Sequence, residues 1–179
     1  NPVPVLLEAF SHEQPCSPGQ NPVVLNAVHE VFKLTNNKGI LVADRGFDGR
    51  VMIEDWLDNK FRFVVRLVGK RHLMRFLGHY RQPVPIRAID LAEQTPTKSR
   101  FHKLVKRHGK PTLRVTQIGW TKVQLPGRDE NLTMVVSRLA GVNKPMMLLT
   151  NLTIENHKDA KRILRLYIRR WECEEGIRF

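Results

Sequence analysis

The chain has 179 residues, of which 41% are hydrophobic, so it is long and apolar enough to bury a core and is not a disordered polymer. No apolar run approaches the roughly 18 residues of a membrane-spanning helix, and the two cysteines, Cys16 and Cys173, indicate neither a disulfide framework nor a zinc site. The net charge is +13, and residues 61–128 alone contain 16 Lys and Arg against two acids. An ordinary solvated surface mixes both signs of charge, so this surplus favours binding of a polyanion such as nucleic acid.

The first 69 residues alternate between strand and helix patterns. VPVLLEAF (3–10) reads as a strand, and this start lacks the basic residues and long apolar middle of a secretory signal, so we expect a cytosolic protein. NPVVLNAVHEVFKLTNN (21–37) has the apolar spacing of a helix, and ILVA (40–43) is apolar on both sides, as in a strand covered on both faces. A second helix follows, capped by Asp48 or Gly49, and FRFVVRLVG (61–69) is a further strand.

The middle of the chain has a different pattern. From about Lys70 to Lys144, short stretches of β character are separated by Pro and Gly, and no helix of any length is indicated. These stretches include VPIRAIDLA, HKLVKRHG, LRVTQIGW, KVQLP and LTMVVSRLA. MMLLTNL (146–152) returns to the composition of a core strand, and the last 24 residues form a strong helix pattern. The sequence therefore predicts an α/β core, residues 1–69 and 146–179, with a mixed sheet flanked by helices, interrupted by a basic and mostly β insertion, residues 70–145.

Asp44 follows the predicted strand 40–43 at a sharp turn of sequence Asp-Arg-Gly-Phe-Asp-Gly. Asp is a good turn former, which explains the residue without any chemistry, whereas a carboxylate at a strand end can also hold a metal ion. Arg45 beside it can contact DNA or pair with a neighbouring acid, and we favour the pairing.

One glutamate of the terminal helix faces the sheet by its spacing. Positions seven apart differ by only about 20° in direction, so Tyr167 and Glu174 lie in one row along the apolar stripe. Arg170 is four residues before Glu174 and within reach of it. Burying a carboxylate is costly unless a cation meets it, so Glu174 is either a functional ligand or half of a Glu174–Arg170 pair that supports the helix.

These motifs carry a family resemblance. VADRGFDG after an apolar strand, followed about 105 residues later by LLTN and about 125 residues later by YIRRWECEE, resembles the DDE transposases of bacterial insertion sequences. More narrowly, it is similar to the subgroup with a Tyr-x2-Arg-x3-Glu-x6-Lys signature and a ribonuclease-H-like catalytic domain that carries a β insertion before its last helix. Tyr167, Arg170 and Glu174 match that signature, and Asp44 matches the second catalytic aspartate.

The chain departs from the family pattern in three places. The acids before Asp44 are Glu8, Glu13 and Glu30, none in a context that suits the first catalytic aspartate. The signature lysine would fall seven residues after Glu174, beyond the last residue. We therefore expect a fragment truncated at both ends and inactive alone. Met146 stands where relatives often have a tryptophan.

The resemblance implies a chemistry and a set of partners. Asp44 and Glu174 would join the missing aspartate to bind two Mg²⁺ ions, or Mn²⁺ as a substitute, for cleavage and strand transfer of DNA in cut-and-paste transposition. Tyr167 and Arg170 would contact phosphates of the transposon end or target. The intact enzyme would act as a homodimer, in the bacterial cytoplasm at the nucleoid.

Basic residues of the predicted insertion are further candidates for DNA contact. They would hold backbone phosphates rather than read bases, and they include Lys103, Lys106, Arg107 and Lys110. Trp120 can stack on an unpaired base or, as we favour, join the hydrophobic core. Two other functions fit the same residues: a sequence-independent DNA-binding module whose acids are structural, and a metal-dependent nuclease of similar fold without strand transfer.

Overall fold

The structure is a computed structural model that describes residues 20–76, 83–107 and 110–177, and only the main chain of residues 20, 103–107, 110–111 and 171–177. The predicted strand 3–10 and Cys16 lie outside these residues. None of the helices in this part of the chain is long and apolar enough to cross a membrane. The elements in chain order are α1 (Gln20–Leu34), β1 (Leu41–Ala43), the 3₁₀ helix η1 (Arg45–Phe47), α2 (Arg50–Asp58), β2 (Phe63–Arg66), β3 (His72–Arg75), β4 (Val84–Arg87), α3 (Ala88–Gln94), β5 (Ser99–Arg107), β6 (Lys110–Val123), β7 (Leu132–Leu139), β8 (Met146–Thr150) and α4 (His157–Ile177).

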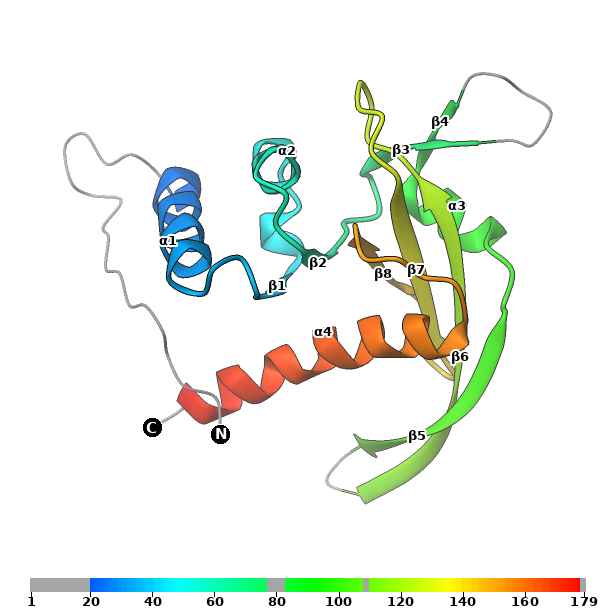
Figure 1. Cartoon of the computed structure of the whole chain (residues 1–179). Helices are drawn as coiled ribbons and strands as arrows, with labels where there is room; N and C mark the ends of the chain where they lie inside the picture. Colours follow the sequence, from blue (N-terminus) through cyan, green and yellow to red (C-terminus); the bar gives the residue numbers. More distant parts are fainter. Residues whose placement is uncertain (1–19, 77–82, 108–109, 178–179) are drawn as a thin grey trace.

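Six strands form one mixed sheet in the order β1-β2-β8-β7-β6-β5, and β3 pairs with β4 in a separate ribbon (Figure 1). β1 and β2 run parallel, with Ala43 opposite Val65, and every other neighbouring pair of this sheet is antiparallel. Helices flank the sheet, which confirms the predicted α/β class and ribonuclease-H-like architecture. β8 lies between β2 and β7, so the strands of the predicted insertion continue the sheet of the predicted core.

Each face of the sheet has its own hydrophobic core. Phe63 and Val65 of β2 point to one side, where they pack with α1 and α2 through residues such as Phe32 and Trp56. Val64, between them, points to the other side, where α4 packs. This alternation of side chains along one strand is the reason β2 is apolar at successive positions.

The absence of helix predicted for residues 70–144 is wrong. Residues of the stretch VPIRAIDLA, expected to be β throughout, divide into β4 and the two-turn helix α3. Ala88, Leu91 and Ala92 are buried at helical spacing, and Asp90 lies in the first turn, where a carboxylate is favourable. In so short a segment the apolar pattern of a helix is hard to distinguish from the alternating pattern of a strand, so packing decides which structure forms.

Gly119 in β6 is required by a close approach of the chain. A β-carbon at this position would lie 2.3 Å from the carbonyl oxygen of Pro96 and 3.0 Å from Cγ2 of Thr95. We expect Gly119→Ala to lower the free energy of unfolding by about 3 kcal/mol, because backbone rather than a flexible side chain must move. Urea unfolding measures this loss. Gly46→Ala is the control, since its β-carbon would meet nothing within 4 Å, and equal losses in the two variants would contradict the explanation.

Candidate active site

Asp44 is held at the junction between β1 and η1. Its main chain is extended, and its carboxylate accepts a hydrogen bond at 2.7 Å from the N–H of Arg45, so Asp44 is the N-cap of the 3₁₀ helix. The next helix, α2, begins after Gly49, one of the two predicted caps. The turn-forming role therefore exists. This cap uses one of the two carboxylate oxygens, Oδ1, and the other oxygen, Oδ2, takes no part in the cap.

The fold brings Asp44 against α4, 123 residues further along the chain. The Tyr167 hydroxyl donates a hydrogen bond to Oδ1 of Asp44 at 2.7 Å. The guanidinium of Arg170 lies 3.5 Å from Oδ2, and that of Arg66 lies 3.9 Å from Oδ1. Tyr167 is fully buried, whereas the Asp44 side chain is 37% exposed, so solvent and ions can reach the carboxylate. Strand end and helix thus form one polar cluster at the edge strand β1.

The cluster controls the ionisation of its acid. Burial raises the pKa of Asp44, but the hydrogen bonds from Tyr167 and the Arg45 N–H and the charges of Arg170 and Arg66 together outweigh it, so the pKa lies below its usual range. Burial and the hydrogen bond to Asp44 raise the pKa of Tyr167, which therefore stays a neutral donor. At neutral pH the cluster presents a carboxylate surrounded by donors and cations.

Arg66 was missed by the sequence reasoning, although a signal was present. It is one of two arginines, with Arg62, in the otherwise apolar stretch FRFVVRLVG, and it stands at the end of the strand. Because β1 and β2 are parallel and Ala43 is opposite Val65, the next residue of each strand, Asp44 and Arg66, comes level at the same end of the sheet. A charged residue at the end of each of two adjacent parallel strands would have predicted this pair.

Glu174 lies in α4 beyond Arg170, where the structure describes the main chain only. It follows Tyr167 by seven residues, about 10 Å of helix rise, and Arg170 by one turn. Its side chain lies outside the described residues, so whether it is a ligand or a structural partner of Arg170 stays a prediction. Among the described side chains, no three His, Cys, Asp or Glu residues form a group that could hold a metal ion.

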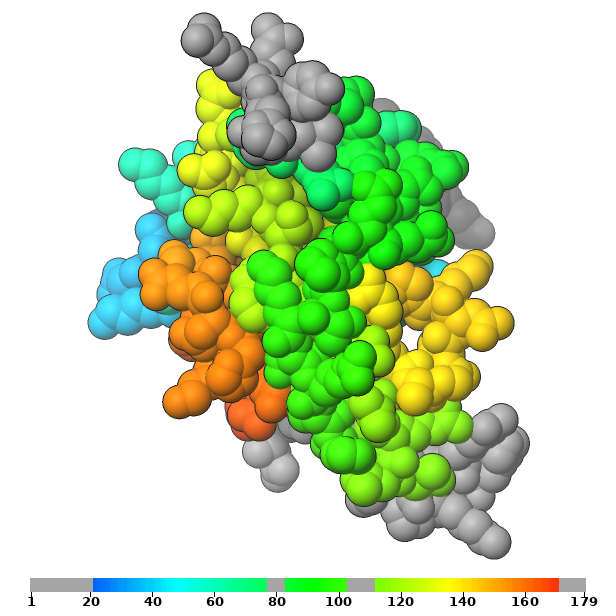
Figure 2. All heavy atoms as spheres, turned by 90° about the vertical axis from the view of Figure 1, so that its right-hand side faces the viewer, coloured from blue at the N-terminus to red at the C-terminus, as the bar shows by residue number. Residues whose placement is uncertain are grey.

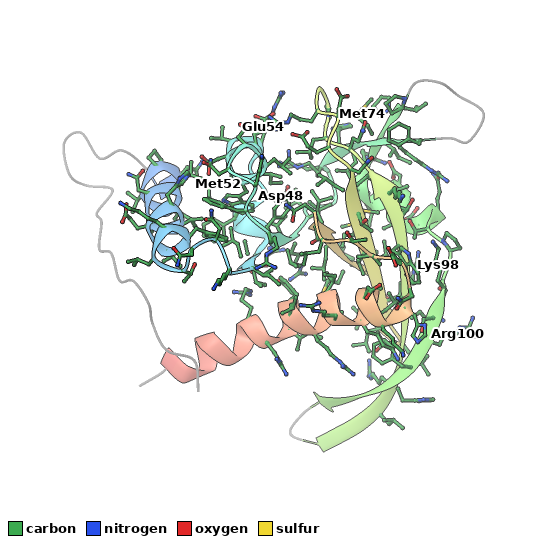
Figure 3. The ribbon with its side chains drawn as sticks, viewed as in Figure 1. Asp48, Met52, Glu54, Met74, Lys98 and Arg100 are labelled. Carbon is green, nitrogen blue, oxygen red and sulfur yellow. The ribbon has the colours of Figure 1, made fainter. Side chains whose placement is uncertain are left out.

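A second carboxylate of the same turn, that of Asp48, is buried and has a structural role. Asp48 is 4% exposed and accepts hydrogen bonds at 2.7 Å from the N–H of Val68 and from Nε of Arg71. Figure 3 shows Asp48 where α2 meets the sheet. Burial raises the pKa of Asp48, and the Val68 N–H and the Arg71 charge oppose that rise. A cleft of about 380 Å³ adjoins it, and the basic side chains of this cleft are Arg50, Lys70, Arg71 and His72.

The other predicted contact residues lie at separate places. Arg45 is exposed, and none of the ion pairs in the described part of the chain includes it, so the favoured pairing is not found there. Trp120 packs partly buried against the core under α4, with the Lys98 ammonium 4.6 Å from its ring centre. Lys103, Lys106 and Arg107 belong to β5 and Lys110 opens β6, with side chains outside the described residues.

The carboxylate oxygens of Asp44 are suitable ligands for a divalent ion. Carboxylate oxygens are the ligands that Mg²⁺ prefers, and Oδ2 of Asp44 accepts no hydrogen bond from the main chain. The guanidiniums of Arg170 and Arg66 lie beside the same carboxylate and would compete with an ion that binds there. Oxygen chemistry and exposure fit the ion, and the neighbouring cations set its affinity.

Removing the Tyr167 hydroxyl tests the cluster directly. We expect Tyr167→Phe to raise the pKa of Asp44, because the ionised form loses a hydrogen bond, and to cost about 1–2 kcal/mol of stability, since the acceptor is charged but partly exposed. A depressed carboxyl pKa stabilises the fold above the unfolded pKa of about 4. The loss of unfolding free energy in Tyr167→Phe should therefore be largest at neutral pH and should disappear in acid, where Asp44 is protonated. Carboxyl ¹³C titration and urea unfolding measure the two effects, and a pH-independent deficit would contradict this account.

The sequence matches a known protein family. The model of the transposase DDE domain matches residues 6–179, nearly the whole sequence. No curated protein matches it.

Proposed function

The chain belongs to the transposase DDE domain family, and from this premise we propose that Asp44 and Glu174 are two of the acidic ligands of its catalytic centre. The family implies an enzyme that acts on DNA and uses divalent metal ions. We further infer that the enzyme performs Mg²⁺-dependent cleavage and strand transfer of DNA by in-line attack on phosphodiesters, with Mn²⁺ as a substitute.

The hydrogen bond between Tyr167 and Asp44 is the observation that supports this assignment most strongly. It joins the strand-end aspartate to the helix row that also contains Glu174. A purely turn-forming aspartate needs only the Arg45 N–H, which it already has. Three further groups converge on the same carboxylate from β2 and α4, as expected where charge must be held for chemistry.

Asp44 and Glu174 would help to hold two Mg²⁺ ions, which would supply activation of a water or 3′-hydroxyl and stabilisation of the leaving oxygen. The chain's own residues would hold and orient the substrate. Arg170 lies against Asp44 and one turn before Glu174, so it would offset the repulsion between the two acids when no ion is bound. Arg170 and Arg66, which lie beside Asp44, would also be placed to contact the phosphate of the substrate, with Arg suited to two parallel hydrogen bonds.

The division of the chain suggests separate tasks. We infer that residues 1–69 and 146–179 supply the acids, while the basic segment 70–145 holds DNA along its backbone. Lys103, Lys106, Arg107 and Lys110 would serve this second task, with Arg45 near the site. Trp120 would stack on a base only if DNA binding released it from its present packing. The intact enzyme would pair two DNA ends as a homodimer, in the cytoplasm at the nucleoid.

Titration with Mn²⁺ tests the proposal on this chain. We expect Mn²⁺ to bind near Asp44 but DNA cleavage to await the third acid, since the acids before Asp44 do not suit that role. Calorimetry measures binding, and DNA affinity is measured beside it. DNA binding without a Mn²⁺ site would favour the alternative of a non-catalytic DNA-binding module. In the intact enzyme, cleavage without joining of a labelled 3′-hydroxyl end would favour a nuclease.

A further inference from the structure

The outer side of α4 carries a row of basic residues that the proposed site does not use. Its members are separated by four, three and four positions, so they point within about 60° of one another on a helix. All are exposed. This outer row consists of Lys158, Arg162, Arg165 and Arg169. Figure 3 shows nitrogen-tipped side chains extending from α4 away from the sheet.

The outer row faces away from the Asp44 cluster. Ala160, Ile163, Leu164 and Tyr167 form the buried side of α4, and Tyr167 points about 180° from the centre of the row. A helix with its side chains is about 10–12 Å across, so the row and Asp44 lie on opposite sides of that thickness. A straight duplex lying along the row would therefore have α4 between itself and Asp44.

The charge of the outer row is not neutralised within the described part of the chain. None of the salt bridges there includes any of its four residues. Asp159, the nearest acid of the helix, instead accepts hydrogen bonds from the N–H groups of Glu155 and Asn156. In the sequence the cationic run ends at Glu172, three positions after Arg169.

The row continues toward a second basic element. Lys161, on the flank of α4, places its ammonium 4.5 Å from the ring centre of Phe101 in β5. Figure 2 shows β5 (green) beside the first half of α4 (orange). The basic side of α4 thus adjoins the edge strand of the sheet.

We propose that the outer row of α4 binds the sugar–phosphate backbone of a duplex DNA segment other than the one at Asp44. The first and last members of the row are 11 positions apart, about 16 Å along the helix, which matches roughly five nucleotides at about 3.4 Å of rise each. The four exposed cations form no salt bridge in the described part of the chain and suit a polyanion, and contacts to its phosphates do not depend on the base sequence. This inference rests on the proposed function only for the existence of the first segment; DNA binding by the row does not require metal or cleavage.

The salt dependence of DNA binding tests the row. In the row variant, Lys158, Arg162, Arg165 and Arg169 all become Gln, which keeps helix propensity. The control variant removes four charges elsewhere by changing Lys33, Lys38, Lys60 and Lys144 to Gln, all exposed. Each phosphate contact contributes about 0.9 to the slope of log affinity against log salt. We expect the slope to decrease in magnitude by about 3 in the row variant and by less than about 1 in the control, and equal changes would overturn the proposal.

Bridging tests whether the segment is a second one. Two short duplexes carrying donor and acceptor dyes should be brought together by the wild-type chain and by Asp44→Asn, and not by the row variant. If the row variant has the smaller slope but still bridges, the two-segment claim is wrong. If Mn²⁺ binding at Asp44 fails while the slope and bridging results hold, the catalytic proposal fails and this one stands.

Discussion

Asp44→Asn should lower the affinity of the chain for Mn²⁺ at least about tenfold and leave the fold intact. Loss of outer-sphere partners alone costs about 10–100-fold in metal sites, and the proposal makes Asp44 a direct ligand. An asparagine side chain has the same shape and can still accept the Arg45 N–H as a cap. Under the proposed function, the same change should abolish cleavage wherever the catalytic centre is active. Calorimetric titration and thermal unfolding measure affinity and fold.

The same substitution should not weaken DNA binding. It removes a negative charge that lies against Arg66 and Arg170, so both guanidiniums become more available to phosphate. Asp129→Asn is the matched control, an exposed aspartate outside the cluster, and it should change neither quantity. Unchanged Mn²⁺ affinity in Asp44→Asn would mean that the carboxylate is only a turn cap.

Asp48→Ala should lower the free energy of unfolding by about 3–5 kcal/mol. The change leaves the Arg71 guanidinium, whose side chain is only 18% exposed, without its carboxylate, and it removes the acceptor of the Val68 N–H. Breaking a buried pair from one side is costly because the remaining charge stays desolvated. In a chain of 179 residues this loss corresponds to a fall of about 10 °C in Tm.

Asp48→Asn separates charge from shape in this pair. It keeps an oxygen for the Val68 N–H and loses the negative charge, so its loss of stability should be smaller than that of Asp48→Ala. Urea unfolding of both variants gives the comparison. A loss of less than about 1 kcal/mol in Asp48→Ala would show that the cleft beside Arg71 solvates the guanidinium well enough to replace the carboxylate.

The helices α1, α2 and α4 and the strands β1, β2 and β8 could be predicted from the sequence. Their apolar periods are long or bounded by clear turn residues, so local pattern and tertiary packing agree. The approach of α4 to the end of β1 was expected from the family resemblance, and the structure shows it as the Tyr167–Asp44 hydrogen bond. Spacing along a helix is rigid, which is why Tyr167 could be placed on the buried side before any fold was known.

Other features could not be predicted because they depend on long-range pairing. The sequence shows β5, β6 and β7 as short strands, but only the ladder reveals that they extend the central sheet through β8. LRVTQIGW and KVQLP read as two strands, and they are largely one continuous strand, β6. Asp48 looked like a helix cap, whereas its partners Val68 and Arg71 come from a segment about 20 residues away.

The central claim is that divalent ions bind where the end of β1 meets α4. Paramagnetic broadening of amide signals by Mn²⁺ measures this directly, because the effect falls steeply with distance from the ion. The account predicts that signals of residues 42–47 and 167–175 broaden first and together at low Mn²⁺ concentration. Broadening that begins at other acids, such as Asp58 or Asp129, or that spreads evenly over the surface, would contradict it.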